Sequence, residues 1–390
     1  MIRFEEAYKI VIDSAVKATI EEVDFNNSLN RILAEDIKSD MDMPPFDKSA
    51  MDGFACRQED IKNELEIIET IPAGKVPAKE IKKNQCSKIM TGAMVPQGAD
   101  CVLMVEFTEE ISKNKIRYTK EKSSTNICYT GEDIKTAKIV LKKGTQIKPQ
   151  HIAVLASVGA VKPKVYTRPK VGVISTGDEI IEPENKPGLS QIRNSNAYQL
   201  LAQITQAGAE AEYVGKAADN KKSTFDTISK ALKNNDIVLL TGGVSMGEFD
   251  HVPEIMNQLG IKIHFEQIAV KPGKPTTFGT IDDKFIFGLP GNPVSSFIQF
   301  EILVKPLICK IMNCKHQAKE INLPMGIDYK RKKAERMAWF PVNIKNGIVV
   351  PSNYHGSAHI HALENADALT FIPIGQKIIK KGELVHVRPI

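Results

Sequence analysis

Between residues 168 and 317, short apolar runs alternate with segments of helical spacing, and this alternation restricts the fold more than any other feature of the chain. KVGVIST at 170–176 and DIVLL at 236–240 are strand-like, while NSNAYQLLAQITQAG at 194–208 has capping residues at its start, helical spacing and a glycine at its end. Strands and helices that alternate in this way are typical of a doubly wound α/β domain with a mainly parallel sheet. Ligands of such domains bind beyond the carboxyl ends of the strands, so the loops there are the first places to search for a site.

The segments on either side of this region have other patterns. Residues 4–20 place apolar groups at helical spacing and predict an amphipathic helix, while Pro44 and Pro45 exclude a helix from the loop that follows. From 54 to 137, short apolar runs divided by Gly and Pro predict strands, and this pattern returns near the C-terminus. The sequence therefore predicts a multidomain fold of α/β plus β type. An N-terminal helical and linking domain covers 1–45 and 138–167, and a β-rich inserted domain covers 46–137. The central doubly wound α/β domain covers 168–317, and a small C-terminal β domain covers 318–390.

The composition argues against several classes of protein. The net charge of +5 is spread along the chain and aromatic residues are only 6%, so the Lys-rich runs at 79–83 and 330–333 are interpreted as solvated faces rather than a nucleic-acid surface. The six cysteines form no C-x-x-C pair, the N-terminus lacks the apolar core of a signal peptide, and no apolar stretch approaches the ~18 residues of a membrane span. We expect a cytoplasmic protein with reduced thiols and with neither nucleic acid nor membrane as a partner.

The loop TGGVSMGEFDH at 241–251 follows a buried strand and carries more chemistry than a turn requires. Gly242 and Gly243 have no Cβ, so their backbone N–H groups can approach an anion closely. Ser245 can donate a hydrogen bond to an oxyanion, and Glu248 and Asp250 can bind a divalent cation such as Mg²⁺.

Three other loops of the α/β domain add charge at the same edge of the predicted sheet. STGDEII at 175–181 has adjacent carboxylates, VKPGKPTTFG at 270–279 has two lysines around a Pro-Gly turn, and GLPGNPVSSF at 288–297 places Asn292 as an N-cap before a helix. Each loop alone has an ordinary structural explanation, but together they predict a site for a polyanion and Mg²⁺, suited to phosphoryl chemistry. The chain has no P-loop sequence.

Eight motifs, taken in order, resemble those of the molybdopterin molybdotransferase family, which includes bacterial MoeA and the E domain of gephyrin. They are PPFDKSAMDGFA, IMTGAMVPQGAD, GEDI, STGDE, TGGVSMGEFD, KPGKPTTFG, GLPGNPVS and HGSAH, and they cover nearly the whole chain. The resemblance implies a homodimer of elongated, L-shaped, four-domain subunits. It also implies an active-site cleft between the α/β molybdopterin-binding domain of one subunit and the β domain of the other. The implied reaction hydrolyses adenylylated molybdopterin, releases AMP and inserts molybdenum from molybdate to give molybdenum cofactor, with Mg²⁺ as the assisting cation.

The resemblance also assigns roles to individual residues. The implied catalytic residues are Asp52, Thr91, Asp133, Asp178, Glu179, Asp219 and Asp250. Glu179 and Asp250 are the implied metal ligands. The residues expected to bind the pterin substrate or molybdate are Gly242, Gly243, Ser245, Lys271, Lys274, Pro290, Asn292, Pro293, Arg336 and Ser357.

The chain departs from the family pattern at two places. Cys128, Tyr129 and Thr130 stand before GEDI where the family often has arginines, and Arg193-Asn194 stand before Asn196 where the family usually has an acid. These departures leave open how the substrate phosphates or the pterin are held. The preference between molybdate and tungstate is also open.

Two other functions remain as alternatives. One is the sister enzyme, molybdopterin adenylyltransferase, which the resemblance matches only in the middle domain. The other is a non-catalytic molybdopterin-binding scaffold, against which the acids Asp52, Glu179 and Asp250 argue. The adenylyltransferase and the molybdoenzymes that accept the finished cofactor are the expected partners besides a second copy of the chain.

Overall fold

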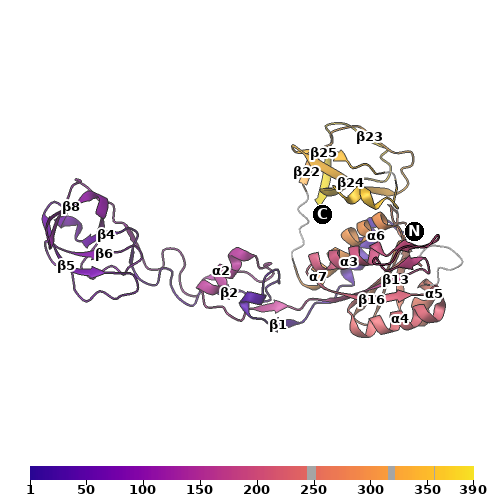
Figure 1. Cartoon of the computed structure of the whole chain (residues 1–390), viewed down its shortest axis with the longest axis horizontal. Helices are drawn as coiled ribbons and strands as arrows, with labels where there is room; N and C mark the ends of the chain where they lie inside the picture. Colours follow the sequence, from indigo (N-terminus) through magenta and orange to yellow (C-terminus); the bar gives the residue numbers. More distant parts are fainter. Residues whose placement is uncertain (244–251, 315–320, 355) are drawn as a thin grey trace.

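The computed structural model describes residues 1–243, 252–314, 321–354 and 356–390, which form several units along an elongated molecule (Figure 1). A β unit lies at one end, a small linking unit lies in the middle, and an α/β unit with the C-terminal β unit lies at the other end. The chain passes through the linking unit on its way to the distant β unit and again on its return. This arrangement confirms the predicted multidomain α/β plus β fold, while the predicted domain borders stay predictions.

The α/β unit contains a six-stranded sheet in the order β16-β13-β17-β21-β20-β18. The first three pairings are parallel and the last two are antiparallel, so the mainly parallel sheet has an antiparallel edge. The predicted loop at 270–279 is wrong in its second half, because β20 begins at residue 275 and pairs with both neighbours. The strands are β13 (Lys170–Thr176), β16 (Glu210–Ala217), β17 (Ile237–Thr241), β18 (Lys262–Gln267), β20 (Pro275–Ile281) and β21 (Lys284–Leu289).

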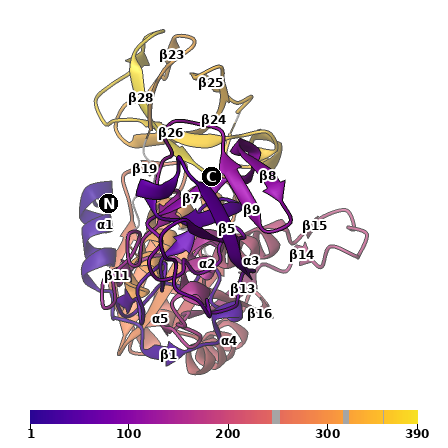
Figure 2. The same ribbon diagram turned by 90° about the vertical axis from the view of Figure 1, so that its left-hand side faces the viewer.

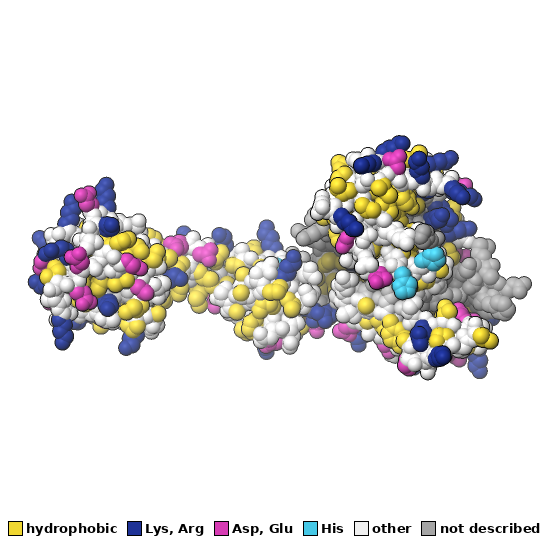
Figure 3. All heavy atoms as spheres, turned by 45° about the horizontal axis from the view of Figure 1, so that its top comes forward, with side chains coloured by type: hydrophobic (Ala, Val, Ile, Leu, Met, Phe, Trp, Pro, Cys, Tyr) yellow, Lys and Arg dark blue, Asp and Glu magenta, His cyan; other side chains and the backbone are white. Residues whose placement is uncertain are grey.

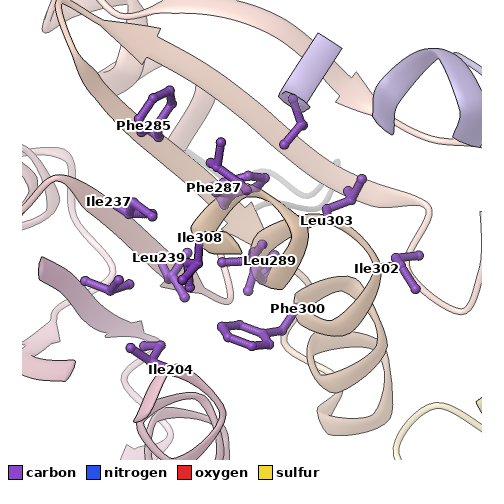
Figure 4. Packing of buried hydrophobic residues seen from close by; sticks show 14 of the residues in the cluster. Ile204, Ile237, Leu239, Phe285, Phe287, Leu289, Phe300, Ile302, Leu303 and Ile308 are labelled. Atoms are coloured by element: carbon purple, nitrogen blue, oxygen red, sulfur yellow. The ribbon is translucent and has the colours of Figure 1, made fainter. Parts of the chain in front are cut away.

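Helices cover both faces of this sheet, and the side chains of β17 show why its sequence is apolar throughout. Ile237 and Leu239 belong to a core with α3, α6, η4 and α7 (Figure 4). Val238 and Leu240 belong to a second core with α4 and α5. A strand buried on both faces needs a continuous apolar run rather than alternation. The helices are α3 (Ser195–Gln206), α4 (Lys221–Asn234), α5 (Val252–Gln258), α6 (Pro293–Gln299), the π-helical turn η4 (Phe300–Val304) and α7 (Lys305–Ile311).

The first helix, α1 (Phe4–Asp13), packs on the α/β unit through Ala7 and Val11. The predicted helix over 4–20 is therefore correct only as far as residue 13. The Ser14 hydroxyl donates to the Ile10 carbonyl, and the Ala18 N–H donates to the Ile311 carbonyl 3.1 Å away. After the last turn of α1, the backbone bonds to other segments instead of continuing the helical hydrogen bonds. β1 (Ile20–Glu22) then pairs with β12 (Lys164–Tyr166).

The distant β unit is a six-stranded sheet in the order β7-β4-β6-β5-β9-β8. Its strands are β4 (Gly53–Cys56), β5 (Glu64–Ile71), β6 (Gln85–Ile89), β7 (Cys101–Met104), β8 (Thr108–Ser112) and β9 (Lys115–Tyr118), with short 3₁₀ turns η2 (Gln58–Asp60) and η3 (Val105–Phe107). The linking unit and the outgoing and returning segments contain η1 (Phe25–Asn27), β2 (Ile37–Lys38), β3 (Lys48–Ser49), β10 (Ile127–Cys128), β11 (Ile139–Leu141) and α2 (Pro149–Ser157). Pairing of β2 with β11 and of β3 with β10 holds these two segments side by side.

The C-terminal β unit shares a strand with the α/β unit. Its sheet has the order β19-β24-β26-β28-β22, and Val270 and Lys271 of β19 pair in parallel with Met337 and Ala338 of β24. The segment that carries Lys271 is thereby fixed between the two units. The elements are β19 (Val270–Lys271), β22 (Ile321–Pro324), β23 (Tyr329–Lys330), β24 (Met337–Lys345), β25 (Ile348–Pro351), η5 (Ile360–Leu363), β26 (Ala368–Ile372), β27 (Ile378–Ile379) and β28 (Leu384–Pro389).

A short arm leaves the α/β unit between residues 180 and 193. The parallel pair β14 (Ile180–Ile181) and β15 (Ile192–Arg193) forms its base, and the arm projects from the body of the molecule (Figure 2). In the described part of the chain, none of the helices combines the length and the hydropathy needed to cross a membrane.

Candidate functional site

A cleft of about 690 Å³ lies at the carboxyl ends of β13, β17 and β21, where the strand order predicts a ligand site. Six of the residues predicted from the sequence line it. They are Glu179, Gly242, Gly243, Pro290, Asn292 and Pro293. We call this the acid cleft after Glu179, the only carboxylate among its described lining residues. Arg193, which belongs to the second departure from the family pattern, lines the same cleft and is the only lysine or arginine among those residues.

The conformation of Gly242 has a cause within the protein. Its φ is +93°, and a Cβ at this position would lie 2.7 Å from the Oγ1 atom of Thr176. The chain after β17 thus crosses the end of β13 so closely that a side chain at Gly242 does not fit. A close approach of the same backbone to a ligand stays a prediction.

Polar contacts that the sequence did not reveal fix the wall of the acid cleft. The Asn196 amide donates to the Thr241 hydroxyl and to the Gly291 carbonyl, both at 2.8 Å. Asn194 caps α3 by accepting from the Ala197 N–H, and its amide donates to the Tyr213 hydroxyl. The motif NSN at 194–196 is thus more than a helix start, since its two asparagines connect three loops of the cleft.

A second cleft of about 730 Å³ lies between the α/β unit and the C-terminal β unit. It shares Pro275, Pro290 and Asn292 with the acid cleft, so the two are neighbours with a common wall. We call it the basic cleft, because the lysines and arginines along it face no carboxylate among its described lining residues. The residues predicted from the sequence that line it are Lys271, Lys274, Pro290, Asn292, Arg336 and Ser357, and Lys330, Arg331, Lys332 and Lys333 lie along it as well.

The lysines of the run KRKK at 330–333 are exposed, as the interpretation of a solvated face requires, and they also border the basic cleft. The position of this run within seven residues of Arg336 was the signal that could have placed it near the site.

Buried polar contacts hold the loop that carries Lys271 and Lys274. The Gln299 amide, fully buried, donates to the Pro272 carbonyl at 3.0 Å, and the Thr276 hydroxyl donates to the Gly273 carbonyl at 2.8 Å. Gly273 has a φ of +103°, and a Cβ there would lie 2.3 Å from Nε2 of Gln299. Neither Gln299 nor Thr276 was expected from the sequence, because their role depends on a contact between distant segments.

Asn292 and Ser357 join the two units at the shared wall. Asn292 occupies the N-cap position of α6, as predicted, but its side chain makes no capping hydrogen bond. Instead its Nδ2 donates to the Ser357 hydroxyl at 3.0 Å, and the Val294 N–H donates to the Ser357 carbonyl. Arg336 adds a third connection, since its guanidinium donates to the Val270 carbonyl.

Asp178 and Asp219 lie outside the described lining of both clefts. The Asp178 N–H donates to a carboxylate oxygen of Asp219 at 3.1 Å, and the Asp219 N–H donates to a carboxylate oxygen of Asp178 at 3.3 Å. This reciprocal pair ties the loop after β13 to the loop after β16. Its geometry shows a fastening role, while the predicted catalytic role of both acids stays a prediction.

Asp52 and Thr91 lie together at the far end of the molecule. The Thr91 N–H and hydroxyl both donate to one oxygen of Asp52, at 2.6 and 2.9 Å, and these bonds lower the pKa of the carboxyl group. Asp133 is exposed on the returning segment, where its N–H donates to the Met43 carbonyl. Within one chain, the structure does not bring these three residues to the clefts (Figure 1).

Thr130, one of the departures from the family pattern, has a clear contact. Its N–H and its hydroxyl donate to one oxygen of Asp47 at 2.7 and 2.8 Å, as Thr91 does to Asp52. Thr130 thus fixes the returning segment to the outgoing one.

Ser245 and Asp250, with Glu248, lie outside the described residues. Among the residues that the structure does describe, no three histidine, cysteine or acidic side chains gather as a metal site.

Known proteins similar to this chain match it from end to end. Residues 2–159 match the MoeA N-terminal region (domain I and II), residues 172–310 a probable molybdopterin binding domain, and residues 323–390 the MoeA C-terminal region (domain IV). The molybdopterin molybdenumtransferase of Staphylococcus epidermidis is 38% identical over 99% of this chain and 95% of its own length. The protein of the same name from Bacillus subtilis is 34% identical over 99% of this chain and 93% of its own.

A solved structure gives the same result for the fold. The molybdopterin biosynthesis MoeA protein of Pyrococcus horikoshii aligns with a TM-score of 0.86 and 32% identity, covering 100% of this chain and 99% of that one. Identity at this level over nearly the full length confirms the resemblance seen in the motifs. The chain belongs to the molybdopterin molybdotransferase family, a family of transferases.

Proposed function

We propose that the chain inserts molybdenum from molybdate into adenylylated molybdopterin and releases AMP. Family membership supports the transfer of molybdenum to molybdopterin. The observation that carries the finer proposal is the pair of adjoining clefts with different charge, divided by Pro275, Pro290 and Asn292. A substrate with a pyrophosphate and a dithiolene can occupy one cleft while an oxyanion occupies the other, so the reacting groups meet at the shared wall.

The acid cleft suits a pyrophosphate with Mg²⁺. Glu179 is exposed in the cleft, and its carboxylate lies beside Gly177, where a Cβ would be 2.5 Å from one of its oxygens. Magnesium in phosphate sites takes one or two carboxylates together with water and substrate oxygens, so Glu179 fits as one ligand, with Asp250 as the second predicted ligand. The bound cation would neutralise charge on the pyrophosphate. The chain itself orients the substrate by the asparagine-fixed loops around Thr241 and Gly291.

The basic cleft suits molybdate, a tetrahedral dianion. Lys271, Lys274 and Arg336 supply charge, and the Ser357 hydroxyl supplies a polar group on the shared wall. Ammonium and guanidinium groups bind oxyanions by charge-assisted hydrogen bonds. Because the β19–β24 pairing and Gln299 fix the lysine loop, these groups are positioned before the ligand binds.

The active form is proposed to be a homodimer. Asp52, Thr91 and Asp133 lie far from the clefts of their own chain, which supports a site completed by the β unit of a second copy (Figure 1). A cytoplasmic location is also proposed, since all six cysteines are free. The adenylyltransferase that makes the substrate and the molybdoenzymes that accept the product are the proposed transient partners.

The sister adenylyltransferase is a weaker candidate. The C-terminal unit supplies half of the basic cleft, including Arg336 and Ser357, and this unit matches a region named for MoeA. An enzyme that uses the middle domain alone does not need these residues.

The direct test measures AMP by chromatography after purified protein is mixed with adenylylated molybdopterin, with and without Mg²⁺ and molybdate. Release that requires both supports the transferase. Glu179→Gln should lower the release at least ~100-fold, the order of loss expected when a key electrostatic group is removed. Glu6→Gln, an exposed change on α1, is the matched control and should keep the wild-type rate. Tight pterin binding without release would instead favour the scaffold.

A further inference from the structure

Seven cationic side chains line the basic cleft, and only some of them are explained by binding one small dianion. Lys271, Lys274 and Arg336 lie on the loop and strand that meet at the β19–β24 pairing. Lys330, Lys332 and Lys333 approach the same cleft from the residues just before Arg336, in a segment that belongs entirely to the C-terminal β unit. We call residues 330–336 the basic turn.

The basic turn is a fixed structure rather than a loose lysine loop. Arg331 donates from its guanidinium to the carbonyls of Gln376, Arg336 and Pro373, at 2.8, 2.6 and 2.5 Å. The Arg331 N–H donates to the Lys377 carbonyl, and the Gly375 N–H donates to the Ala334 carbonyl. Arg331 thus donates to backbone carbonyls within and beside the turn. The three lysines are the exposed cations of the run at 330–333.

Those three lysines are exposed, and none of them has an ion-pair partner among the described residues. The nearby Asp328 is paired with Lys380, and Glu335 is not among the described residues that line the cleft. Like charges held close together cost stability. A rigid turn that concentrates them beside other cations is therefore better explained by a negatively charged ligand than by solubility. On the face shown in Figure 3, basic side chains gather over this end of the molecule.

We propose that Lys330, Lys332 and Lys333 form a collecting rim that draws a small oxyanion into the basic cleft, without being ligands in its final position. The inference rests on the proposed binding of molybdate by Lys271, Lys274 and Arg336. A cleft lined by one sign of charge raises the local concentration of the opposite ion and its association rate. The rim therefore acts on the rate of capture, while the inner residues act on the rate of release.

Trp339 gives a direct signal for this step, because it is the single tryptophan of the chain and lines the basic cleft. Binding of molybdate is followed by stopped-flow tryptophan fluorescence, with calorimetric titration as the second measurement. The test variant is Lys332→Gln with Lys333→Gln. The matched control is Lys230→Gln with Lys233→Gln, which removes the same charge from the C-terminal end of α4. The cleft near Lys233 is lined by Lys170 at the amino end of β13, so this control lies at the opposite edge of the sheet.

At low salt, the rim variant should lower the association rate constant for molybdate roughly 3- to 10-fold and leave the dissociation rate constant unchanged. The difference should nearly vanish at about 1 M salt, where the Debye length is ~3 Å. The control should match the wild type at both salt concentrations.

Three results would overturn the rim. The first is an equal association rate constant for the rim variant and the control variant. The second is a loss of molybdate affinity in the rim variant that comes from faster dissociation and persists at high salt. The third is absence of molybdate binding by the wild type. If molybdate binds with these rates but no AMP is released under any condition, the proposed transferase function fails and the rim stands. If AMP release depends on molybdate while the rim variant binds it normally, the function stands and the rim fails.

Discussion

At the scale of single residues, the same contact occurs three times: a threonine donates both its backbone N–H and its hydroxyl to one oxygen of an aspartate. Thr91 does so to Asp52, Thr130 to Asp47 and Thr136 to Asp42. For Asp42 and Asp52, these bonds lower the pKa of the carboxyl group, with the threonine side chain and backbone as the main causes. The charge of Asp52 is thus retained at neutral pH and lost only in acid.

Thr91→Val tests what this pair contributes. The variant removes the hydroxyl donor, keeps the N–H donor and nearly keeps the side-chain volume. We expect AMP release to fall on the order of 10-fold, because the hydroxyl is one of the two donors that Thr91 provides to the charged Asp52 oxygen. Thr91→Ser retains the donor and should stay within ~3-fold of the wild type, since the change in interaction is small. Equal rates for Val and wild type would show that the carboxylate needs no support from this hydroxyl.

Sequence reasoning was most successful for residues whose type fits one chemical task. Motifs predict Glu179, Lys271 and Lys274, and the family resemblance adds Arg336. Each of the four lies in one of the two clefts, while their roles as ligands stay predictions. Gln299 was not named, because glutamine in a helix has no sequence signature, and its role comes from burial against Gly273. The predicted ligands lie at recognisable loops, whereas the residues that position these loops are specified only by tertiary contacts.

At the scale of elements, the tight contact between Gly273 and Gln299 gives a stability prediction. Gly273→Ala places a methyl group at positive φ and against the fully buried Gln299, whereas Gly260→Ala has positive φ but nothing within 4 Å. Backbone strain alone costs about 1–3 kcal/mol. Overpacking should add about 1–3 kcal/mol at Gly273 only.

Urea unfolding of both variants measures this difference, and the molybdate concentration for half-maximal activity should rise for Gly273→Ala alone. Identical losses of stability would show that Gln299 moves aside without cost.

His264 on β18 gives the α/β unit a pH dependence. It stacks on Phe278 with ring centroids 5.4 Å apart and bonds to the Thr280 hydroxyl, and burial, aided by Lys262, lowers its pKa. Between this lowered pKa and the ordinary value of about 6.5, the unfolded chain binds more protons than the folded one. The free energy of unfolding should therefore decrease as the pH falls below about 6.5, in the part of the curve that His264 controls.

His264→Gln removes the titrating imidazole from the folded and the unfolded chain. The free energy of unfolding of the variant should therefore depend less steeply on pH between about 5 and 7, the range around the ordinary histidine pKa. Urea titrations at several pH values compare the slopes. Parallel curves for the variant and the wild type would assign the pH dependence to other groups.

Element boundaries were harder to predict from sequence than element types. The strand and helix alternation of the α/β unit was predicted correctly, because burial on both sheet faces requires long apolar runs. The strand in the second half of 270–279 was not predicted. The Pro and Gly residues of this segment indicate the turn at 272–274, and they do not indicate the strand that begins at residue 275. The end of α1 was missed because Ala15 and Ala18 continue the apolar pattern beyond the helix. They pack against the core, the Ala18 N–H donates to the Ile311 carbonyl, and Ile20 pairs with β12.

At the scale of the whole molecule, β4, which directly follows Asp52, lies at the opposite end of the elongated chain from β13, which precedes Glu179 (Figure 1). In the proposed homodimer, this separation predicts complementation. Asp52→Asn and Glu179→Gln should each be inactive alone. After the two are mixed and allowed to exchange subunits, half of the dimers carry one variant of each kind, and each of these has one intact composite site. The mixture should recover about 25% of wild-type AMP release.

No recovery, in a mixture shown by mass spectrometry to contain mixed dimers, would place both residues in the same site of a single chain. If activity recovers when the two variants are refolded together but not when folded dimers are mixed, the result would show only that subunit exchange is slow.

The packing of α1 on α7 also determines the order in which the chain can acquire its structure during synthesis. Residues 4–13 are synthesised long before the helix that they pack against, which ends at residue 311. At about 5–20 residues per second, the first helix waits roughly 15–60 s for its partner. The distant β sheet, whose strands all lie within residues 53–118, is complete long before that. A nascent chain is therefore expected to complete its distant β sheet before α1 docks on α7.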